Sequence, residues 1–394
     1  MLKKIILVMN AGSSSLKFKI YEDKANIASG QIERVGLSDP IFSAKDANGA
    51  VIGDKKWSDG VVRDHEFVLS FLVDWILGTF KGYEISACGH RVVHGGVLFN
   101  KATILDDKAL NDLESVTHLA PLHNPNALRI IKLMRKLFPS MPQVGVFDTS
   151  FHQSMPEEAT YYAIPYELYK EGVRRYGMHG TSYQYIIHKM SEDFPDFAKK
   201  RLVIAHIGSG ASLCATNNGK CVLTTMGLTA LEGVPMGTRA GSIDPGILLY
   251  LMENKNFGVD EIRDFLYHKS GMLGLSGYSP NFYALEMDIP KKSEAARAYG
   301  FMTTRTAEEI ARLMVASNGC DGIVFTAGVG ENSSYFRSEV CKKLAYLGIK
   351  LDDAKNEKRG EAVISSPDSK IKIFTIPTNE ELMIALETKA LVAQ

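Results

Sequence analysis

The sequence predicts an α/β protein built from two related halves, and three observations carry this prediction. Short apolar, β-branched runs bounded by glycine or asparagine recur along the chain, as buried strands do. Helical patterns lie between these runs, which is the order of an α/β fold. A strand followed by a glycine-rich turn occurs near the N-terminus and again near the middle of the chain. At 394 residues, the chain should also form about two domains.

The individual elements follow from local patterns. The clearest helix is Ser293–Asn318, where apolar side chains recur at spacings of three and four and Gly319 follows as a stop signal. No low-complexity or Pro-rich stretch interrupts the chain, so any domain boundary should be tightly packed rather than a loose tether. The predicted strands are Ile5–Met9, Val144–Phe147, Leu202–Ile207, Ile323–Thr326 and Ile371–Ile376.

The internal repeat relates residues 5–16 to residues 202–213. Each segment has an apolar run, a polar residue, a Gly/Ser turn and a second apolar run, and a third such loop lies at 326–332. A strand followed by glycine is common in α/β proteins, so the repeat alone leaves duplication and coincidence both open. Small residues in such turns let backbone N–H groups approach an anion, which favours phosphate binding. None of the three loops matches the P-loop or dinucleotide fingerprints.

Composition excludes several classes of protein. Lys plus Arg (45) equals Asp plus Glu (45), so the basic surplus typical of nucleic-acid binding is absent. The five cysteines contain no C-x-x-C pair, which argues against a disulfide framework and a zinc site and fits a reducing cytoplasm. The first apolar run ends at Met9, too short for a secretory signal, and no stretch approaches the roughly 18 apolar residues of a membrane span. We therefore expect a soluble cytoplasmic protein with no nucleic-acid or membrane partner.

A family resemblance covers nearly the whole chain. The sequence resembles the acetate kinase (acetokinase) family of the acetate and sugar kinase/actin superfamily at residues 10–17, 89–96, 119–125, 146–153, 179–182, 236–241, 325–332 and 377–382. It implies a duplicated ribonuclease-H-like, actin-like ATPase fold with two lobes and an interlobe cleft. The expected lobes are residues 1–150 with about 380–394, and the nucleotide-binding residues 151–379. It also implies a homodimer that reversibly transfers the γ-phosphoryl group of ATP to acetate by direct in-line transfer.

This reaction brings together reactants of like charge. At ~4 Å and an effective dielectric constant near 20, each pair of unit charges repels by roughly 4 kcal/mol, so the site needs several cations. The resemblance implies that Arg91 holds the substrate carboxylate, Arg239 stabilises the transferring phosphoryl group and His179 stabilises the transition state. It also implies an active-site role for Asp148. Because the substrate carboxylate is already ionised at pH 7, we expect Asp148 to orient the site and its metal rather than abstract a proton.

Each of these residues has a structural alternative. An arginine can serve a surface ion pair, a lone histidine is more often a structural residue, and an aspartate after a strand can cap the next turn. The resemblance favours the functional interpretation.

The remaining site residues also rest on the resemblance. Asn10 and Glu380 are expected to bind Mg²⁺, with Mn²⁺ as an alternative, since oxygen ligands suit these ions. Lys17 is expected to meet the ATP phosphates. The other ATP-binding candidates are His206, Ile207, Gly208, Ser209, Gly210, Gly328, Val329, Gly330, Glu331 and Asn332, for which ordinary strand-to-helix turns remain the alternative. The acyl-pocket candidates are Val93, Leu122 and Met178.

The sequence departs from the family pattern in three places. Asn281, Phe282 and Tyr283 stand at a nucleotide segment where the family usually has Asp, an apolar residue and Arg, which leaves the choice of nucleotide open. Ser209 replaces a common Asn. In the acyl pocket Met178 replaces Phe and Ala230 replaces Pro, which predicts a larger pocket and measurable phosphorylation of propionate.

Two alternative functions follow. One is a propionate kinase. The other is a non-catalytic, nucleotide-gated protein of actin-like fold, which would not need Arg91, Asp148 and Arg239 together.

Overall fold

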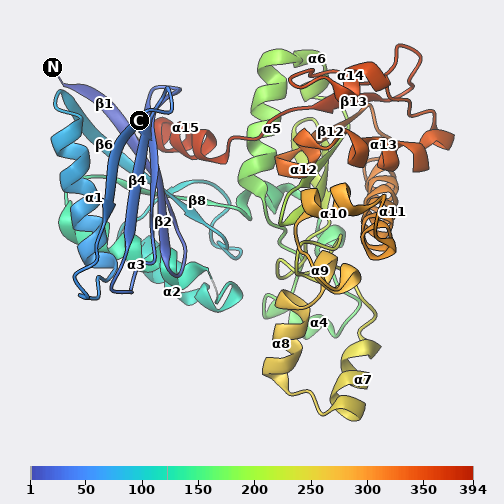
Figure 1. Ribbon diagram of the computed structural model, residues 1–394, viewed down its shortest axis with the longest axis horizontal. Coiled ribbons are helices and arrows are strands. Elements are labelled where there is room, and N and C mark those ends of the chain that lie inside the picture. Colours follow the sequence, from blue (N-terminus) through green and yellow to red (C-terminus); the bar gives the residue numbers. More distant parts are fainter. Residues whose placement is uncertain (1, 122, 394) are drawn as a thin grey trace. The chain divides into compact units, whose positions relative to one another are not determined.

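The computed structural model describes residues 2–121 and 123–393. The chain forms two compact units, which we describe separately: unit 1 comprises residues 1–151 and 379–394, and unit 2 comprises residues 152–378. In Figure 1, unit 1 contains the blue sheet together with the red C-terminal helix α15.

Unit 1 is built on an eight-stranded sheet in the order β5-β4-β3-β2-β1-β6-β8-β7. Strands β1 to β5 pair antiparallel, whereas β1, β6 and β8 run parallel. The strands are β1 (Lys3–Ala11), β2 (Ser15–Glu22), β3 (Ala25–Glu33), β4 (Ile41–Asp46), β5 (Val51–Lys56), β6 (Tyr83–Val92), β7 (Thr103–Ile104) and β8 (Gln143–Phe147). The helices are α1 (His65–Thr79), α2 (Asp107–Ser115), α3 (Asn124–Leu137) and α15 (Glu380–Val392), with a 3₁₀ turn at Thr117–Leu119.

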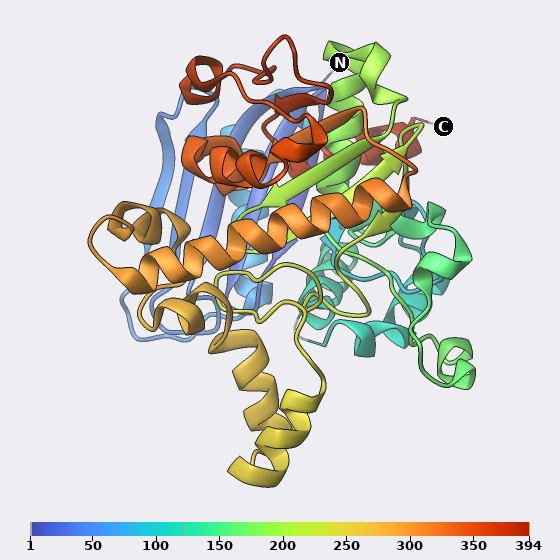
Figure 2. The same cartoon turned by 90° about the vertical axis from the view of Figure 1, so that its right-hand side faces the viewer.

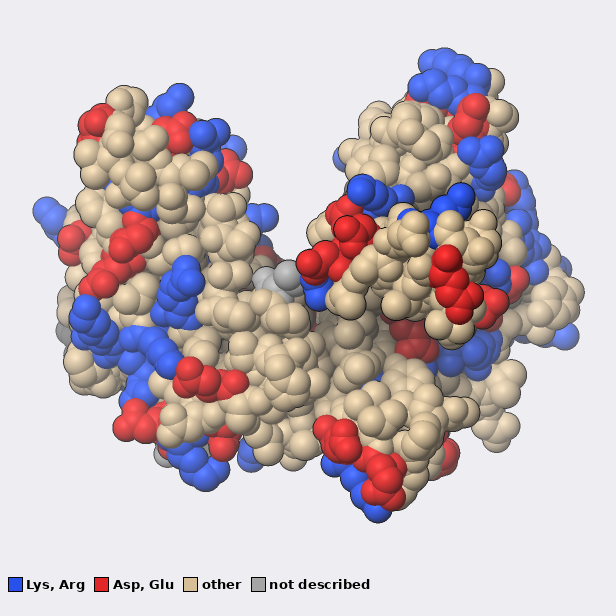
Figure 3. All heavy atoms as spheres, turned by 90° about the horizontal axis from the view of Figure 1, so that it is seen from below, with Lys and Arg blue, Asp and Glu red and all other residues tan. Residues whose placement is uncertain are grey.

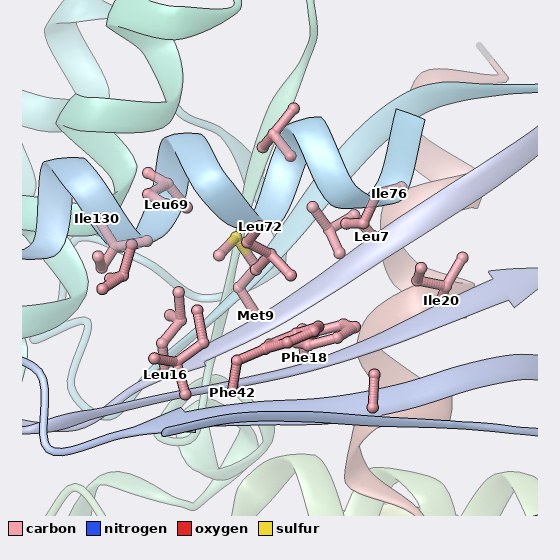
Figure 4. Close-up of a cluster of buried hydrophobic side chains, with 14 of the residues drawn as sticks. Leu7, Met9, Leu16, Phe18, Ile20, Phe42, Leu69, Leu72, Ile76 and Ile130 are labelled. Carbon is pink, nitrogen blue, oxygen red and sulfur yellow. The ribbon is translucent and has the colours of Figure 1, made fainter. Parts of the chain in front are cut away.

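Both faces of this sheet are covered. On one face, alternate side chains of β1 and β2 pack against α1 and α3, as Figure 4 shows for Leu7, Met9, Leu16, Phe18, Ile20, Phe42, Leu69, Leu72, Ile76 and Ile130. On the other face, Ile6 and Val8 pack with Ile384 and Ala385 of α15. A Cβ at Gly89 would lie 2.4 Å from the Thr388 hydroxyl, so this glycine lets α15 approach β6 closely.

Unit 2 contains a five-stranded sheet in the order β11-β10-β9-β12-β13. Its strands are β9 (Leu202–Ile207), β10 (Ala211–Asn217), β11 (Lys220–Thr224), β12 (Gly322–Thr326) and β13 (Lys372–Thr375). The long helix α11 packs against β9, β10 and β11 (Figure 2). The helices are α4 (Tyr166–Lys170), α5 (Gly180–Asp193), α6 (Pro195–Ala198), α7 (Gly246–Lys255), α8 (Val259–His268), α9 (Gly271–Ser276), α10 (Phe282–Asp288), α11 (Ser293–Ala316), α12 (Ala327–Asn332), α13 (Ser334–Lys343) and α14 (Asp353–Glu357), with 3₁₀ turns at Ser150–Ser154, Glu157–Thr160 and Ala345–Leu347.

The two sheets share one topology. In both β3-β2-β1-β6-β8 and β11-β10-β9-β12-β13, the first three strands pair antiparallel and the last three run parallel. The repeated segments 5–16 and 202–213 form the equivalent hairpins, in which Ala11 pairs with Leu16 and Ile207 with Ala211. A coincidental glycine pattern does not explain a shared strand order, so the duplicated ribonuclease-H-like fold is confirmed.

The five predicted strands and the long helix are all present. The helix α11 ends at Ala316, two residues earlier than predicted, because Asn318 and Gly319 adopt left-handed backbone angles (φ 52° and 117°). The prediction of a third glycine-rich loop at 326–332 was wrong: this segment folds as helix α12. Ala327 begins α12 with φ 66°, and its N–H donates to the Glu331 carboxylate at 2.8 Å, which closes the turn.

Charges of both signs are scattered over the surface shown in Figure 3. Among the described residues, no helix has both the length and the apolar character that crossing a membrane requires.

Candidate active site

In unit 1, Arg91 and Asp148 form a buried ion pair. Arg91 lies on β6 opposite Val146 of the parallel strand β8, and Asp148 follows β8 directly. The guanidinium donates from Nη2 to Oδ2 at 2.7 Å and from Nε at 3.2 to 3.3 Å. Asp148 is 1% exposed, and its charge raises the pKa of Arg91. The Asp148 carboxylate therefore fixes the arginine fork at the end of the sheet.

Glu380, the first residue of α15, belongs to the same electrostatic cluster. Burial raises the pKa of Glu380 to about 7; Arg91 opposes this shift, and the charges of Asp148 and Glu381 add to it. Glu380 is thus near enough to Asp148 for their charges to repel. A bound cation would relieve this repulsion, which is the environment that a divalent ion with oxygen ligands needs.

The other unit 1 candidates lie on the first hairpin. Asn10 of β1 pairs in register with Lys17 of β2. Both residues line a groove of about 330 Å³, together with Lys19 and Glu381, which form an ion pair at 3.0 Å. The groove therefore holds Lys17, the amide of Asn10 and a Lys19 cation that Glu381 balances.

Of the acyl-pocket candidates, Val93 is half-buried just after β6, and Met178 of unit 2 is 4% exposed. Leu122 lies outside the described residues.

In unit 2, His179 precedes helix α5 in a left-handed conformation with φ 58°. Its ring stacks on the ring of His206 with centroids 4.2 Å apart, and its Nδ1 lies 2.8 Å from the Ser212 hydroxyl. The Tyr183 hydroxyl contacts the same serine at 2.5 Å. A non-glycine residue at positive φ costs energy, and these contacts hold His179 in that conformation.

Arg239 lies beside His179. Its Nη1 donates to the Ala230 carbonyl at 2.9 Å, and burial lowers its pKa. Among the described residues no carboxylate forms an ion pair with Arg239. A Cβ placed on Gly210 would lie 3.1 Å from Nη2 of Arg239 and 3.4 Å from Nε2 of His179, so these cationic and potentially cationic groups gather around the turn at 208–210.

The loop that carries Arg239 depends on close backbone contacts. Gly271 adopts φ 62°, and a Cβ there would lie 2.1 Å from the Met236 carbonyl oxygen and 2.6 Å from that of Arg239. The N–H of Gly237 donates to the carbonyl of Ser209 at 3.0 Å. Only glycine fits at 271 without displacing the arginine.

The segment His206–Gly210 ends β9 and turns into β10. His206 is buried, with Nδ1 2.8 Å from the Ser182 hydroxyl, which in turn contacts the Thr378 hydroxyl at 2.8 Å. Ile207 is buried, Gly208 and Gly210 are partly exposed, and Ser209 is exposed. The supporting residues Ser182, Ser212 and Thr378 lie in segments that the sequence analysis singled out, but it gave them no role, because a hydroxyl residue does not reveal its partner in the sequence.

The segment 328–332 lies in α12, and its acidic residue faces the protein. Oε1 of Glu331 accepts from the N–H groups of Ala327 (2.8 Å) and Thr378 (2.9 Å). The Asn332 amide donates to the Gly328 carbonyl at 2.9 Å, and Arg337 donates to the carbonyl of Gly330 at 2.9 Å. Gly328 and Val329 follow Ala327 in the first turn of the same helix, where a Cβ on Gly328 would meet nothing within 4 Å.

The segment 281–283 begins helix α10. Asn281 caps the helix by accepting from the Ala284 N–H at 3.1 Å, Phe282 is 5% exposed and packs against Tyr299, and Tyr283 is 75% exposed. Phe282 thus belongs to the core, and Tyr283 is the side chain of this segment that can meet a ligand.

Comparison with known proteins assigns the family. The model of the acetokinase family matches residues 5–386. The chain belongs to the acetokinase family. An acetate kinase of Natranaerobius thermophilus is 44% identical over 400 residues, which cover 99% of this chain and 100% of that protein. An acetate kinase of Rhodopseudomonas palustris is 42% identical over 97% of this chain and 96% of that protein.

Solved structures agree with this acetokinase assignment. The acetate kinase of Porphyromonas gingivalis matches with a TM-score of 0.91 and 38% identity, covering 99% of this chain and 100% of that one. A propionate kinase from Francisella tularensis matches with the same TM-score of 0.91 and 37% identity, covering 98% and 99%. Solved proteins named for two different acids therefore share this fold with the chain.

Proposed function

We propose that this protein is an acetate kinase that uses Arg91, Asp148, His179 and Arg239 as its active-site residues. It transfers the γ-phosphoryl group of ATP to acetate, reversibly, to give acetyl phosphate and ADP. The observation that carries the residue assignment is the half-buried Arg239, whose guanidinium forms no ion pair among the described residues and lies with His179 around the turn at 208–210. Holding a cation partly away from water without a counter-ion is unfavourable unless the site binds an anion.

The chemical step needs no base. A carboxylate oxygen of acetate forms a bond to the γ-phosphorus as the bond between that phosphorus and the β,γ-bridging oxygen breaks, and ADP leaves with the electron pair. Arg239 and His179 would donate hydrogen bonds to the equatorial oxygens of the transferring group, where negative charge is spread in the transition state. His179 is already oriented for this role by Ser212.

Arg91 would position acetate. Its Nε and Nη2 are held by Asp148, and 23% of its side chain is exposed. An arginine oriented in this way presents its remaining N–H groups to a second carboxylate without first paying the entropy of ordering a long side chain. Asp148 acts through Arg91 in this scheme and takes no proton from the substrate.

Mg²⁺ fits the oxygen groups of unit 1. Asn10 and Glu380 would hold it, directly or through its waters, and Asp148 would add negative charge nearby. When bound, Mg²⁺ would neutralise part of the phosphate charge. Lys17 and Lys19 supply further positive charge in the groove that Asn10 lines.

The nucleotide would be held mainly by unit 2. The turn at 208–210 would present the N–H groups of Ser209 and Gly210 to the phosphates, since the Gly208 N–H donates to the Gly210 carbonyl at 3.0 Å. Helix α12 lies next to β9. Glu331 shapes this region by bonding Ala327 and Thr378 rather than by contacting ATP. Near the base, the exposed Tyr283 offers an aromatic face but no guanidinium, so discrimination between ATP and GTP should be modest.

Propionate is the second candidate acceptor. Met178 stands where the family usually has Phe, and Ala230 stands where it usually has Pro. A propionate kinase also matches the structure with the same TM-score as an acetate kinase. One methylene in an apolar pocket is worth about 1–3 kcal/mol. We therefore expect the enzyme to prefer acetate moderately and still to phosphorylate propionate.

A hydroxylamine-trapping assay tests these assignments. The purified protein is given acetate, propionate or butyrate, each with ATP, GTP or pyrophosphate and Mg²⁺. We expect acetate with ATP to be the best pair and propionate to react with a kcat/KM within a thousandfold of the acetate value. No acyl phosphate from any acid would refute the proposed function, and a larger gap would refute the enlarged pocket.

We also propose a homodimer located in the cytoplasm. Helix α7 exposes Leu249 (60%), Tyr250 (54%) and Met252 (48%), and with α8 it projects from the rest of unit 2 (Figure 2). Apolar side chains of this size on one helix are typical of an interface. Light scattering of the protein and of the variant Leu249→Glu should give a dimer and a monomer respectively; a monomeric wild-type protein would refute this part.

A further inference from the structure

A cluster of one imidazole and two thiols lies inside unit 2, on residues to which the proposed reaction gives no role. Cys214 of β10 and Cys221 of β11 have their sulfurs 3.4 Å apart, and Nδ1 of His152 lies 3.2 Å from the sulfur of Cys221. The three potential ligand atoms lie within 4.8 Å of one another, and the three residues are at most 1% exposed. Two thiolates and a neutral imidazole are the ligands that Zn²⁺ and other thiophilic ions prefer.

The other nitrogen of the His152 ring is already anchored as in a metal site. Nε2 lies 2.9 Å from the carbonyl oxygen of Met178, an acceptor that fixes the proton on Nε2. This tautomer leaves the lone pair of Nδ1 directed at Cys221. Histidines that bind metal characteristically donate their second N–H to a carbonyl or carboxylate in this manner.

The charges of the ligands also favour a divalent ion at this buried cluster. Two thiolates and one neutral imidazole around a divalent cation carry no net charge, so the complex avoids the cost of burying an uncompensated ion. Without metal, the Cys214 thiol donates to the sulfur of Cys221.

We propose that His152, Cys214 and Cys221 form a binding site for a thiophilic divalent ion such as Zn²⁺, distinct from the Mg²⁺ site of the reaction. Binding forms two metal–sulfur bonds and one metal–nitrogen bond and releases the two thiol protons to solvent. The absence of a C-x-x-C pair does not exclude the site, because its ligands come from the β10–β11 hairpin and a distant 3₁₀ turn.

The site is linked to the segment that ends in His179. A Cβ on Gly177 would lie 2.7 Å from the His152 ring and 2.4 Å from the Thr224 methyl group, so the ring and β11 pack directly on this glycine. In a tetrahedral zinc complex the two sulfurs lie about 3.8 Å apart, a few tenths of an ångström more than the distance here. When the sulfurs move apart, the residues packed around them, including Gly177, must shift. Gly177 is joined through Met178 to His179, so the shift can change the position of His179. Occupancy should therefore lower kcat.

The test titrates the reduced full-length protein with Cd²⁺, whose bonds to thiolate absorb in the ultraviolet. We expect one equivalent to bind after incubation, with the absorbance of two thiolates, and the chelator EDTA to reverse it. Cys214→Ser and Cys221→Ser should each weaken binding at least tenfold. The control Cys341→Ser, which removes a different buried cysteine of unit 2, should bind like the wild type.

A folding control and a kinetic measurement complete the test of the metal site. Circular dichroism must show that the serine variants are folded, and the wild-type titration tests the site even without these variants. Zn²⁺ in the presence of excess Mg²⁺ should lower kcat several-fold in the wild type and in Cys341→Ser but not in Cys221→Ser. A titration that shows no charge-transfer band, or an equal band in Cys221→Ser, would overturn the proposal. Because binding is measured without substrate, its failure is separate from any failure of the kinase assignment.

Discussion

Replacing Arg239 with methionine separates catalysis from stability, because this half-buried guanidinium has no ion-pair partner among the described residues. Methionine keeps the length and apolar volume of the side chain and removes its charge. One unit of positive charge ~4 Å from the phosphoryl oxygens, at an effective dielectric constant near 20, is worth roughly 4 kcal/mol. Each ~1.4 kcal/mol of barrier is a tenfold change in rate, so we expect kcat to fall about a thousandfold.

The same substitution should leave the fold almost unchanged. Arg239 donates one hydrogen bond, to the Ala230 carbonyl, and the loss of that bond is offset by removing a half-buried and unpaired charge. We expect the free energy of unfolding in urea to change by less than about 1 kcal/mol. A structural arginine would give the opposite result, with a large loss of stability and little change in kcat.

Arg201→Met is the matched control. Arg201 pairs with Asp321 through two contacts of 2.9 Å and is not a site residue. The Arg201→Met variant should lose a little unfolding free energy and keep the kcat of the wild type. The kcat values come from hydroxylamine trapping of acetyl phosphate. An Arg239→Met enzyme with kcat within tenfold of the wild type, or one destabilised by more than about 3 kcal/mol, would refute the reasoning.

Three further substitutions test other parts of the molecule, two in the candidate site and one at a buried histidine. Asp148→Asn removes the charge that orients Arg91, so kcat/KM for acetate should fall about ten- to a hundredfold with 1–3 kcal/mol of lost stability; unchanged activity at low and high Mg²⁺ would discard the role of Asp148. Met178→Phe should narrow the acyl pocket and lower the propionate-to-acetate ratio of kcat/KM about tenfold, whereas Met178→Leu should not; an unchanged ratio in the Phe variant would place this side chain outside the pocket. Burial lowers the pKa of His90 to about 4, against about 6.5 when unfolded, so protonation favours the unfolded state as pH falls. From pH 7 to pH 5 the wild type should lose about 2 kcal/mol of unfolding free energy through this residue, and His90→Gln should lack that part of the loss; identical urea midpoints at both pH values in the two proteins would contradict it.

The strands that were predicted from the sequence are short continuous apolar runs. In β9 and β12, for example, every residue is buried. Strands β2 to β5 were not predicted, since their apolar residues alternate with polar ones: in β2, Lys17 and Lys19 separate Leu16, Phe18 and Ile20. Alternation over so few residues is a weaker signal than a continuous run.

The residues of the candidate site were predicted only where they lie in sequence segments that match the family. The Arg91–Asp148 pair joins two strands whose registry is not visible in the sequence, and the Ser212 contact to His179 joins a hairpin to a helix. The helical state of 327–332 was missed for a related reason. Glycine-rich sequences have little helix propensity, and here the Glu331 side chain closes the turn instead.

Arg91 and Arg239 have different electrostatic roles because their environments differ. Arg91 has a permanent counter-ion in Asp148, so its charge is balanced whether or not acetate is bound, and its cost to stability is small. Arg239 has no such partner among the described residues, so its full charge is available when negative charge develops on the phosphoryl group. A residue that stabilises a transition state should be unbalanced in the free protein, because a resident carboxylate would compete with the phosphoryl oxygens for the same N–H groups. Introducing an acidic side chain at Ala230, next to Arg239, should therefore depress kcat more than the uncharged Ala230→Gln of the same size, and the ratio of the two rates measures the value of leaving this guanidinium unpaired.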